Sequence, residues 1–459
     1  MPMDCESLIL AAGLGTRMQT GLPKLLHPLG DRPLLRWSVE ACRQATGRDP
    51  YVVVGPESGQ LRSAAGPGVR FVVQSDRLGT GHAAAQAEGE LRGKAGLVLV
   101  TNADMPMITA DTYRRLVQAQ AGHAGPFTLL VAETARARGF GRIQRDGQGR
   151  LQAVVEEAQA SAEQLAGHEL NLGAYCFRAD WLWEHLHRIP LSPKGEHYLT
   201  DLVGIAVAEG STPLPVAAEE EEAIGVNTLE HLAEAEAALR WRINRGWMQA
   251  GVRFQDPATA YIGAEVRLGA GTVVLANTHV RGASRVGADC ELGPNSILQD
   301  AILGDRCRVL ASVLEGAELA EEVEVGPFAR LRTGTRLGRG VHVGNFGEIK
   351  NSTLGAGVKV GHFSYLGDAT IGEDVNIGAG TITCNFDGSQ KHPTQIEAGA
   401  FIGSDTMLVA PVEVGARSVT GAGSVVNHDV PPDSLAVGMP ARVRRRRTNA
   451  RQGGRGKGA

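Results

Sequence analysis

The stretch VGHFSYLGDATIGEDVNIG, residues 360–378, decides how the C-terminal half of the chain folds. In it an aliphatic residue followed by glycine recurs about every six positions, at Val360, Leu366, Ile371 and Ile377. A period of six predicts a triangular coil in which each face is one short strand, with the aliphatic side chain inside and the small residue at the corner. Each such coil buries its core only against its neighbours.

The same period continues on both sides of this stretch. The aliphatic positions before it are Ile262, Leu268, Val274, Val280, Val286, Leu292 and Leu298, then, after a shift near Leu303, Val325, Leu331, Leu337, Val343 and Leu354. The period breaks over residues 383–394 and returns at Ile402, Leu408 and Val414. An insertion that leaves a coil intact is expected to be a loop, and loops on rigid scaffolds often carry function.

Polar residues that a core does not need stand between the aliphatic positions. His362 can act as a general base near neutral pH, and Arg332 and Lys350 offer cations to a phosphate. A histidine alone would more often be structural. The neighbouring polar residues favour a catalytic site instead; they are Tyr365, Asn376, Asn385 and Lys391.

The N-terminal part predicts a nucleotide-binding α/β domain. An apolar run at 7–12 leads directly into Gly13 and Gly15, which predicts a buried strand, a close backbone approach to a ligand and an opening helix whose N–H groups face phosphate. Arg17 and Lys24 add cations there. Further strand-like runs at 51–54, 70–74, 96–101 and 128–132 predict a mainly parallel, Rossmann-like sheet covered on both faces.

Ligands of such a sheet gather at the carboxyl ends of its strands. Gln74 and the small residues of 79–83 follow one strand and could admit a flat base or a ribose. Asp104 follows another strand, and a carboxylate beside a phosphate loop is a natural Mg²⁺ ligand.

The 459 residues are too many for one ordinary core. We expect an α/β domain at 1–228, a helical linker at 229–251, a hexapeptide-repeat domain at 252–440 and a basic, disordered tail at 441–459. The sixty glycines and 5% aromatic residues suit a solenoid. In the linker, Trp241 and Trp247 are expected to pack, and Gly251 to end the helix.

The composition narrows the class of protein. The six cysteines show no CxxC spacing, no apolar run is long enough for a membrane span, and no signal peptide begins the chain. We therefore expect a cytoplasmic enzyme with reduced thiols that needs neither membrane nor nucleic acid. The formal net charge is −4. The basic tail is interpreted as a solvated arm in preference to an anion-binding segment.

The N-terminal motifs resemble those of sugar-phosphate nucleotidyltransferases. The residues are 10–18 (LAAGLGTRM), 22–24 (LPK) and 79–83 (GTGHA), and the last of these is similar to UDP-N-acetylglucosamine pyrophosphorylases. The resemblance implies uridylyl transfer from UTP to N-acetylglucosamine 1-phosphate, with Mg²⁺ held by Asp104 and Asn227. It implies substrate contacts at Leu10, Ala11, Ala12, Gly13, Arg17, Lys24, Gln74, Gly79, Thr80, Gly141, Glu156, Asn171 and Asn227, with Tyr198 a further sugar contact.

The segments 343–348, 361–368 and 376–385 resemble the acetyltransferase half of a bifunctional bacterial family that carries both activities. This resemblance implies a left-handed parallel β-helix, a homotrimer, acetyl transfer from acetyl-CoA to glucosamine 1-phosphate, and a product used in peptidoglycan and cell-envelope synthesis. His362 would be the general base. Substrate contacts would be Arg332, Lys350, Tyr365, Asn376, Asn385 and Lys391, and acetyl-CoA contacts Ala379, Phe386, Ser404, Ala422 and Arg442.

The sequence departs from this family at a few positions. Ala103 replaces a usual glycine, Asn102 an aromatic or aliphatic residue, and Phe386 a frequent tyrosine, while 157–159 replace a segment that often carries Lys and Asp. Two alternatives stay open at this point. One is a single-activity nucleotidyltransferase for another sugar with the coil as a trimerising stalk. The other is a non-catalytic scaffold of the kind found in translation-factor exchange subunits.

Overall fold

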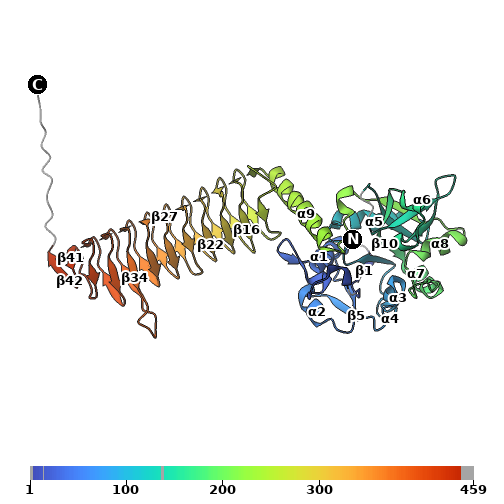
Figure 1. Cartoon of the computed structure of the whole chain (residues 1–459), viewed down its shortest axis with the longest axis horizontal. Coiled ribbons are helices and arrows are strands. Elements are labelled where there is room, and N and C mark those ends of the chain that lie inside the picture. The colour runs from blue at the N-terminus through green and yellow to red at the C-terminus, as the bar shows by residue number, and fades with distance from the viewer. Residues whose placement is uncertain (1–3, 14, 136–138, 446–459) are drawn as a thin grey trace, which may run out of the picture. The chain divides into compact units, whose positions relative to one another are not determined.

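The computed structural model describes residues 4–13, 15–135 and 139–445 of the chain. Two compact units emerge, Met1–Leu239 and Arg240–Ala459 (Figure 1). The boundary between them falls inside the long helix α9 (Leu229–Gln249), and Gly251 beyond its end adopts φ +90°, a conformation that glycine tolerates without strain. Among the described helices, none is long and apolar enough to span a membrane.

The first unit is built on a mixed, mainly parallel sheet, as the sequence predicted. Its strand order is β11-β7-β10-β6-β1-β4-β5, and only β10 runs antiparallel to its neighbours. A short hairpin of β8 and β9 extends from β10. The strands are β1 (Cys5–Leu10), β4 (Tyr51–Val54), β5 (Arg70–Val73), β6 (Leu97–Asn102), β7 (Phe127–Glu133), β8 (Gly141–Arg145), β9 (Leu151–Val155), β10 (Glu169–Arg178) and β11 (Leu214–Ala217).

Helices pack on this sheet because its central strands are apolar on both faces. Leu8, Val53 and Val100 share one core cluster with Ala83 of α3 and Leu182 of α7. The helices α1 and α5 contact one another and also β1 and β7. The helices are α1 (Leu34–Thr46), α2 (Gly59–Ala65), α3 (Thr80–Ala85), α4 (Glu88–Leu91), α5 (Ala110–Gly122), α6 (Ala162–Leu165), α7 (Ala179–His185) and α8 (Asp201–Ala208).

The segment after Gly13 differs from the expected helix. A single 3₁₀ turn, η1 (Thr16–Met18), follows the glycines, and the next is the short η2 (Lys24–Leu26). Gly21 and Pro23 stand between them and disfavour a continuous α-helix. The first α-helix therefore begins only at Leu34, and the segment before it is a loop that carries Arg17 and Lys24.

The second unit is the predicted solenoid, a left-handed parallel β-helix of hexapeptide repeats. Its strands form three sheets in which, up to β39 (Val419–Thr420), each strand pairs in parallel with the third strand along the chain (Figure 1). The last two strands, β41 (Ser434–Gly438) and β42 (Ala441–Arg445), pair antiparallel, so residues 441–445 extend the coil and are not part of the disordered tail that was expected from 441 onward. We name these sheets I, which runs from β12 (Arg253–Phe254) to β42, II, which runs from β13 (Tyr261–Ile262) to β40 (Val425–Val426), and III, which runs from β14 (Arg267–Leu268) to β38 (Val412–Val414). The sheet I strands that carry or adjoin predicted site residues are β27 (His342–Asn345), β30 (Lys359–His362), β33 (Asn376–Ile377), β36 (Phe401–Ile402), β39, β41 and β42. The corresponding strands of sheet II are β25 (Arg330–Leu331), β28 (Glu348–Lys350), β31 (Tyr365–Gly367) and β34 (Ile382–Cys384).

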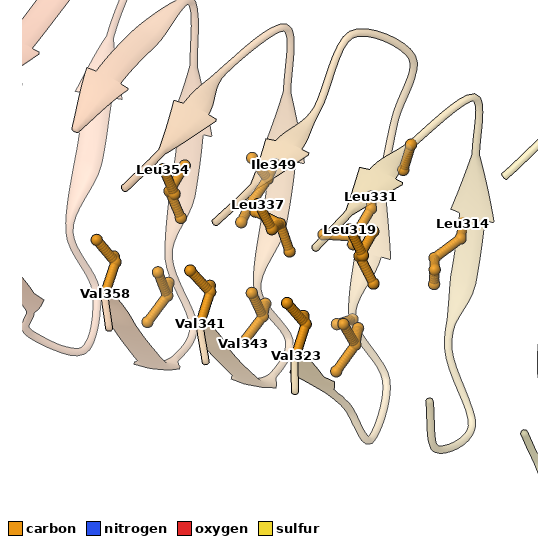
Figure 2. Close-up of a cluster of buried hydrophobic side chains, with 14 of the residues drawn as sticks. Leu314, Leu319, Val323, Leu331, Leu337, Val341, Val343, Ile349, Leu354 and Val358 are labelled. Carbon is orange, nitrogen blue, oxygen red and sulfur yellow. The ribbon is translucent and has the colours of Figure 1, made fainter. Parts of the chain in front are cut away.

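The aliphatic residues of the hexapeptide period fill the interior of the coil. Leu314, Leu331 and Ile349 stack from coil to coil in sheet II, and all three are fully buried (Figure 2). Burying one such side chain contributes roughly 1.5–3 kcal/mol. At the corners the backbones approach closely, since a Cβ on Gly344 would lie 2.0 Å from the carbonyl oxygen of Gly361. Glycine at that corner is thus required by the coil spacing.

The two linker tryptophans behave differently. Trp247 packs against the core of the coil together with Ile243, as expected. Trp241 is 52% exposed, so the prediction that it packs is wrong. The helix presents the two side chains in different directions, because six positions correspond to about 600° at 100° per residue and leave them well apart around the axis.

Candidate functional sites in the two units

A cavity of about 290 Å³ lies at the carboxyl ends of β1 and β6 in the first unit. It is where a parallel sheet is expected to bind a ligand. Most residues predicted to hold UTP line it, namely Leu10, Ala11, Ala12, Gly13, Lys24, Gln74, Gly79 and Thr80, together with Asp104 and Tyr198. The Gln74 amide donates to the carbonyl of Gly79, which ties the strand end to the GTGHA loop.

A second cavity, of about 190 Å³, adjoins the first. The two share Thr80, Asn102, Asp104 and Tyr198. The predicted sugar residues line this second cavity; they are Gly141, Glu156, Asn171 and Asn227. The sequence-predicted residues thus form two joined compartments with Asp104 at the junction, as a reaction between a nucleotide and a sugar phosphate requires.

Two cationic side chains and two oxygen atoms that could bind a metal ion meet at this junction. The Lys24 ammonium lies 2.7 Å from Asp104 Oδ2 and 3.1 Å from Asn227 Oδ1, and the Arg17 guanidinium donates to the same Asn227 oxygen at 2.9 Å. A carboxylate oxygen and an amide oxygen therefore converge on one positive charge, and both are of the hard oxygen type that Mg²⁺ prefers. In the described part of the chain, no group of three or more His, Cys, Asp or Glu side chains could hold a metal ion by itself.

The sugar compartment contains two supporting residues that the sequence did not single out. The Thr200 hydroxyl donates to Glu156 Oε1 at 2.9 Å, and the Asn171 amide donates to the Tyr175 hydroxyl at 2.7 Å. Burial raises the pKa of Glu156, although the Thr200 hydrogen bond opposes that rise. The sequence assigned a role to neither residue: Tyr175 lies outside the recognised motifs, and Thr200 lies in the segment 198–201, whose resemblance to the family pointed only to Tyr198.

Arg77 is another lining residue that the sequence did not single out. It borders the first cavity, and its Nε donates to the carbonyl oxygen of Ala12 at 2.9 Å. It precedes the GTGHA loop by two residues, so an arginine beside a glycine loop was the available signal. Arg77 thus adds a second positive charge to the lining of this cavity, together with Lys24.

A third hollow, which borders the second cavity at Phe140 and Gly225, does not suit a phosphate. It measures about 780 Å³ and is lined by Glu220, Glu221, Glu234 and His231. Carboxylates repel phosphate oxygens, whereas Lys24 and Arg77 in the smaller cavity attract them. The charge of the lining therefore makes the smaller cavity the better candidate for binding phosphate.

In the coil, one corner after sheet I carries the predicted base and most of the predicted acetyl-CoA contacts. Strand registers align Val343, Val360, Ile377 and Ile402 in successive coils. Two positions after these stand Asn345, His362, Ala379 and Ser404, and Ala422 follows in the next coil. These five residues, which we call the base column, lie above one another, although 77 positions separate the first from the last.

His362 is exposed and bonded within this column. Its Nδ1 contacts Asn345 Oδ1 in a short hydrogen bond. An amide oxygen only accepts, so Nδ1 must carry the hydrogen and Nε2 is left as the acceptor of a neutral imidazole. The neighbouring coil thus sets the tautomer that a general base needs.

A group of cationic side chains lies where the sheet II strands β25 and β28 end. Arg332 and Lys350 hold equivalent positions in successive coils, and Lys391 approaches from the loop. The side chain of Lys391 and the charge of Arg332 lower the pKa of Lys350. Arg332 is partly neutralised by Glu348 at 2.9 Å. Like charges gathered in this way favour binding of an anion such as a phosphate.

The remaining predicted residues are spread over three places. The Tyr365 hydroxyl and the Asn385 amide both lie against Gly367, which is in register with Lys350. Asn376 stands on sheet I beside Lys359, so it lies on a different face of the coil from Tyr365. Phe386 is 59% exposed at the base of the loop, where it pairs with Lys391, and Arg442 is exposed on β42 opposite Val437.

Comparisons with known proteins agree with this division. Residues 7–201 match the model of the MobA-like NTP transferase domain, and residues 393–428 match the hexapeptide repeat of succinyl-transferase. Among curated proteins, the chain is 45% identical to the bifunctional protein GlmU of Trichlorobacter lovleyi, over 95% of this chain and 96% of that one. It is 42% identical to that of Pelobacter propionicus, over 96% and 97%, and 38% identical to that of Shouchella clausii, over 95% and 97%. The chain therefore belongs to the family of bifunctional GlmU proteins.

Proposed function

We propose that this chain makes UDP-N-acetylglucosamine in two steps, each in one unit. The coil transfers the acetyl group of acetyl-CoA to glucosamine 1-phosphate, and the α/β unit then transfers the uridylyl group of UTP to the product, releasing pyrophosphate. The observation that carries this proposal is the coexistence of the Lys24–Asp104–Asn227 junction with the base column of His362. Neither a single-activity enzyme nor a non-catalytic scaffold needs both. The product supplies peptidoglycan synthesis.

In the uridylyl step, an oxygen of the sugar phosphate attacks the α-phosphorus of UTP, and the bond to the β-phosphate breaks. The cavity lined by Gln74 and Gly79 would hold uracil, and the second cavity would hold the sugar against Glu156 and Asn171. Arg17, Lys24 and Arg77 would offset the charge of the departing pyrophosphate. Such a reaction needs mainly positioning and electrostatic stabilisation from the protein.

Mg²⁺ is the ion that these donors fit best. Asp104 and Asn227 would hold it, since their oxygens already converge on one cation, and substrate phosphate would complete its ligands. The bound ion would withdraw charge from the phosphates and help align them. Lys24 and Arg17 would remain beside these ligands as protein cations.

In the acetyl step, the amine nitrogen of glucosamine 1-phosphate attacks the thioester carbonyl carbon, and the carbon–sulfur bond breaks. His362 Nε2 would take the proton of the amine, while Nδ1–H stays bonded to Asn345. Arg332, Lys350 and Lys391 would bind the sugar phosphate, and Tyr365 and Asn385 the sugar and its amine. Ala379, Ser404 and Ala422 would lie along acetyl-CoA, with Phe386 and Arg442 farther out. CoA leaves as a thiol, so no acyl-enzyme on Cys384 is required.

Three copies of the chain are proposed to assemble around this site. Phe328, Phe346 and Phe363 stack on one another at 5.6 and 4.9 Å between ring centroids, and each is 50–60% exposed. Phe363 directly follows His362. An exposed aromatic ladder beside a catalytic corner is typical of a protein interface. A neighbouring copy would cover it and could bring Asn376, on another face, to the site.

A cytoplasmic location follows from the substrates, since UTP and acetyl-CoA are made there. The six cysteines are all unpaired, as expected in a reducing compartment.

A coupled assay tests the proposal. Purified chain is supplied with glucosamine 1-phosphate, acetyl-CoA, UTP and Mg²⁺, and the release of CoA and of pyrophosphate is followed separately. We expect both, with pyrophosphate release dependent on acetyl-CoA. If the purified, folded chain released no CoA, or no pyrophosphate, that result would contradict the corresponding half of the proposal.

A further inference from the structure

Three polar residues form a second column at the corner after sheet II. Asn351, Asp368 and Asn385 directly follow Lys350, Gly367 and Cys384, which hold equivalent positions in three successive coils. Asp368 is the middle member. Asn351 and Asp368 adopt φ +46° and +51°, the left-handed region that Asn and Asp tolerate better than most residues. The corner geometry therefore favours these residue types and brings their side chains together.

Asp368 bonds both neighbours. Asn351 Nδ2 donates to its Oδ1 at 2.6 Å, and Asn385 Nδ2 donates to its Oδ2, also at 2.6 Å. An ionised carboxylate only accepts hydrogen bonds, so the nitrogen of each amide must face Asp368. Hydrogen bonds to a charged group are about twice as strong as those between neutral groups. The orientation of the Asn385 amide is thus set by Asp368.

Little else of Asn385 is free to move. The residue as a whole is 6% exposed. Its backbone N–H donates to Thr383 at 2.9 Å, and its carbonyl accepts from His392 N at 2.8 Å. The remaining freedom is rotation of the side-chain amide, which would exchange its oxygen for its nitrogen. Asp368 is the group that prevents this exchange.

We propose that Asp368 is a positioning residue for acetyl transfer, which holds Asn385 so that its amide oxygen faces the amine of the sugar phosphate. This inference rests on the proposed acetyltransferase function. An oxygen accepts an N–H of the attacking amine and leaves the nitrogen lone pair directed at the thioester. A nitrogen in its place would donate to that lone pair and hold it away from the thioester. The Asn385 oxygen also stabilises the positive charge that develops on the attacking nitrogen.

A different explanation for an effect of Asp368 involves the cations that are proposed to bind the sugar phosphate. The charge of Asp368 also acts on Lys350, which lies near Arg332 and Lys391. If Asp368 served only to balance these cations, its loss would change the binding of glucosamine 1-phosphate and leave turnover intact. The kinetic split between KM and kcat therefore separates the two routes.

The test compares two matched truncations in the full chain. Asp368→Gly removes the carboxylate in the middle of the column. Asn351→Gly removes only the amide that bonds Asp368 on the side away from Asn385. Glycine tolerates positive φ at both positions. We expect Asp368→Gly to lower kcat of acetyl transfer by about tenfold or more, the usual range for loss of an outer positioning partner. The KM for acetyl-CoA and the uridylyl activity of the other unit should not change. The kcat of acetyl transfer in Asn351→Gly should stay within about threefold of that of the unchanged chain.

A double-mutant cycle tests whether the effect passes through Asn385. In an Asn385→Ala background, Asp368→Gly should cause no further loss of kcat. The inference is overturned if the two effects multiply, if Asn351→Gly is as harmful as Asp368→Gly, or if only the KM for glucosamine 1-phosphate rises. Should the glycine variant fail to fold, Asp368→Ala provides a second variant that also removes both acceptor oxygens, and it must show the same kcat loss.

Failure of this inference can be told apart from failure of the proposed function. The unchanged chain must release CoA, and His362→Ala must abolish that release, before any Asp368 variant is measured. If the unchanged chain transfers no acetyl group, the proposed function is wrong. If it does and Asp368→Gly has normal kcat, only the positioning role is wrong.

Discussion

The Lys24 ammonium bonds the Asp104 carboxylate at 2.7 Å, although 80 positions separate the two residues in the chain. The lysine side chain is 11% exposed and the aspartate 24%, so the pair is largely shielded from water. Substrate phosphate and a divalent cation would both have to engage this pair. It is therefore the point at which the uridylyl site is most easily disabled.

We expect Lys24→Ala to lower uridylyl transfer by about 100-fold or more, since a preorganised charge that offsets transition-state charge is worth that much. Pyrophosphate release reports the loss, and CoA release by the coil should be unchanged. Arg150→Ala, which breaks the ion pair with Asp146 in the turn between β8 and β9, outside both cavities, serves as the control and should be neutral. Equal loss of both activities in Lys24→Ala would indicate unfolding instead.

Removal of divalent cations by EDTA should stop pyrophosphate release and leave CoA release intact. The reason is that Asp104 and Asn227 converge on a cation, whereas the coil site offers Arg332, Lys350 and Lys391 to its phosphate. Titration of Mg²⁺ back into the assay should restore only the first activity. An acetyl transfer that also needs Mg²⁺ would contradict the assignment of the metal to the α/β unit.

Asn345→Leu should lower kcat of acetyl transfer by about tenfold, because the His362 Nδ1–H loses its acceptor and the tautomer is no longer fixed. His362→Ala should abolish CoA release altogether. Asn345→Asp keeps an acceptor at the same place and should retain more activity than the leucine variant. A leucine variant with full activity would show that the neighbouring coil does not set the state of the base.

Asp387 should hold the loop that carries Lys391 down to acidic pH. It accepts hydrogen bonds from the backbone N–H groups of Gln390 and Ser389 and from His392, and these hold its pKa well below the usual range. A lowered carboxyl pKa contributes stability that is present above the unfolded pKa of about 3.9 and is lost as the pH falls through the folded value. Hydrogen exchange of these amides should thus stay protected at pH 5. Asp387→Ala should remove the protection at neutral pH and raise the KM for glucosamine 1-phosphate.

Gly367→Ala should damage the acetyl site without unfolding the coil. The new Cβ would lie 2.5 Å from the Tyr365 hydroxyl and 2.6 Å from the Asn385 amide nitrogen, and both are ends of side chains that can shift. We expect kcat/KM of acetyl transfer to fall at least tenfold, since misplacing reactive groups by an ångström is costly. The melting temperature of the coil and the uridylyl activity should change little. Normal acetyl transfer would place the substrate elsewhere.

Phe346→Asp should weaken the proposed trimer. Phe346 is the middle ring of the exposed ladder, and a carboxylate there would be buried against apolar surface of another copy. Light scattering after gel filtration should show a smaller particle, and acetyl transfer should fall with it. Ile302→Asp, at another exposed aliphatic position of the coil, provides the control. An unchanged mass for Phe346→Asp would contradict the assignment of the ladder to the interface.

Much of the fold was predictable, because its elements are local patterns. The aliphatic positions that the hexapeptide period identified between Ile262 and Val414 are all 7% exposed or less, although the period did not identify buried residues such as Leu314 and Ile349. The apolar runs located β1, β4, β5, β6 and β7 to within one or two residues. The failures were also local. The helix expected after Gly13 is only a 3₁₀ turn, because Gly21 and Pro23 interrupt it. Trp241 is exposed because it points from α9 in a different direction from Trp247, which packs against the coil.

The sequence alone determined the kinds of chemistry in this protein: a cationic glycine loop, a carboxylate at a strand end, and a histidine among cations on a repeat. These follow from residue types and short spacings. Only the tertiary structure decided which groups bond one another. The contacts of Lys24 with Asp104, His362 with Asn345, and Asp368 with Asn385 join residues that are 17 to 80 positions apart. Strand register and coil stacking create these pairs, and neither is written in any single segment of the chain.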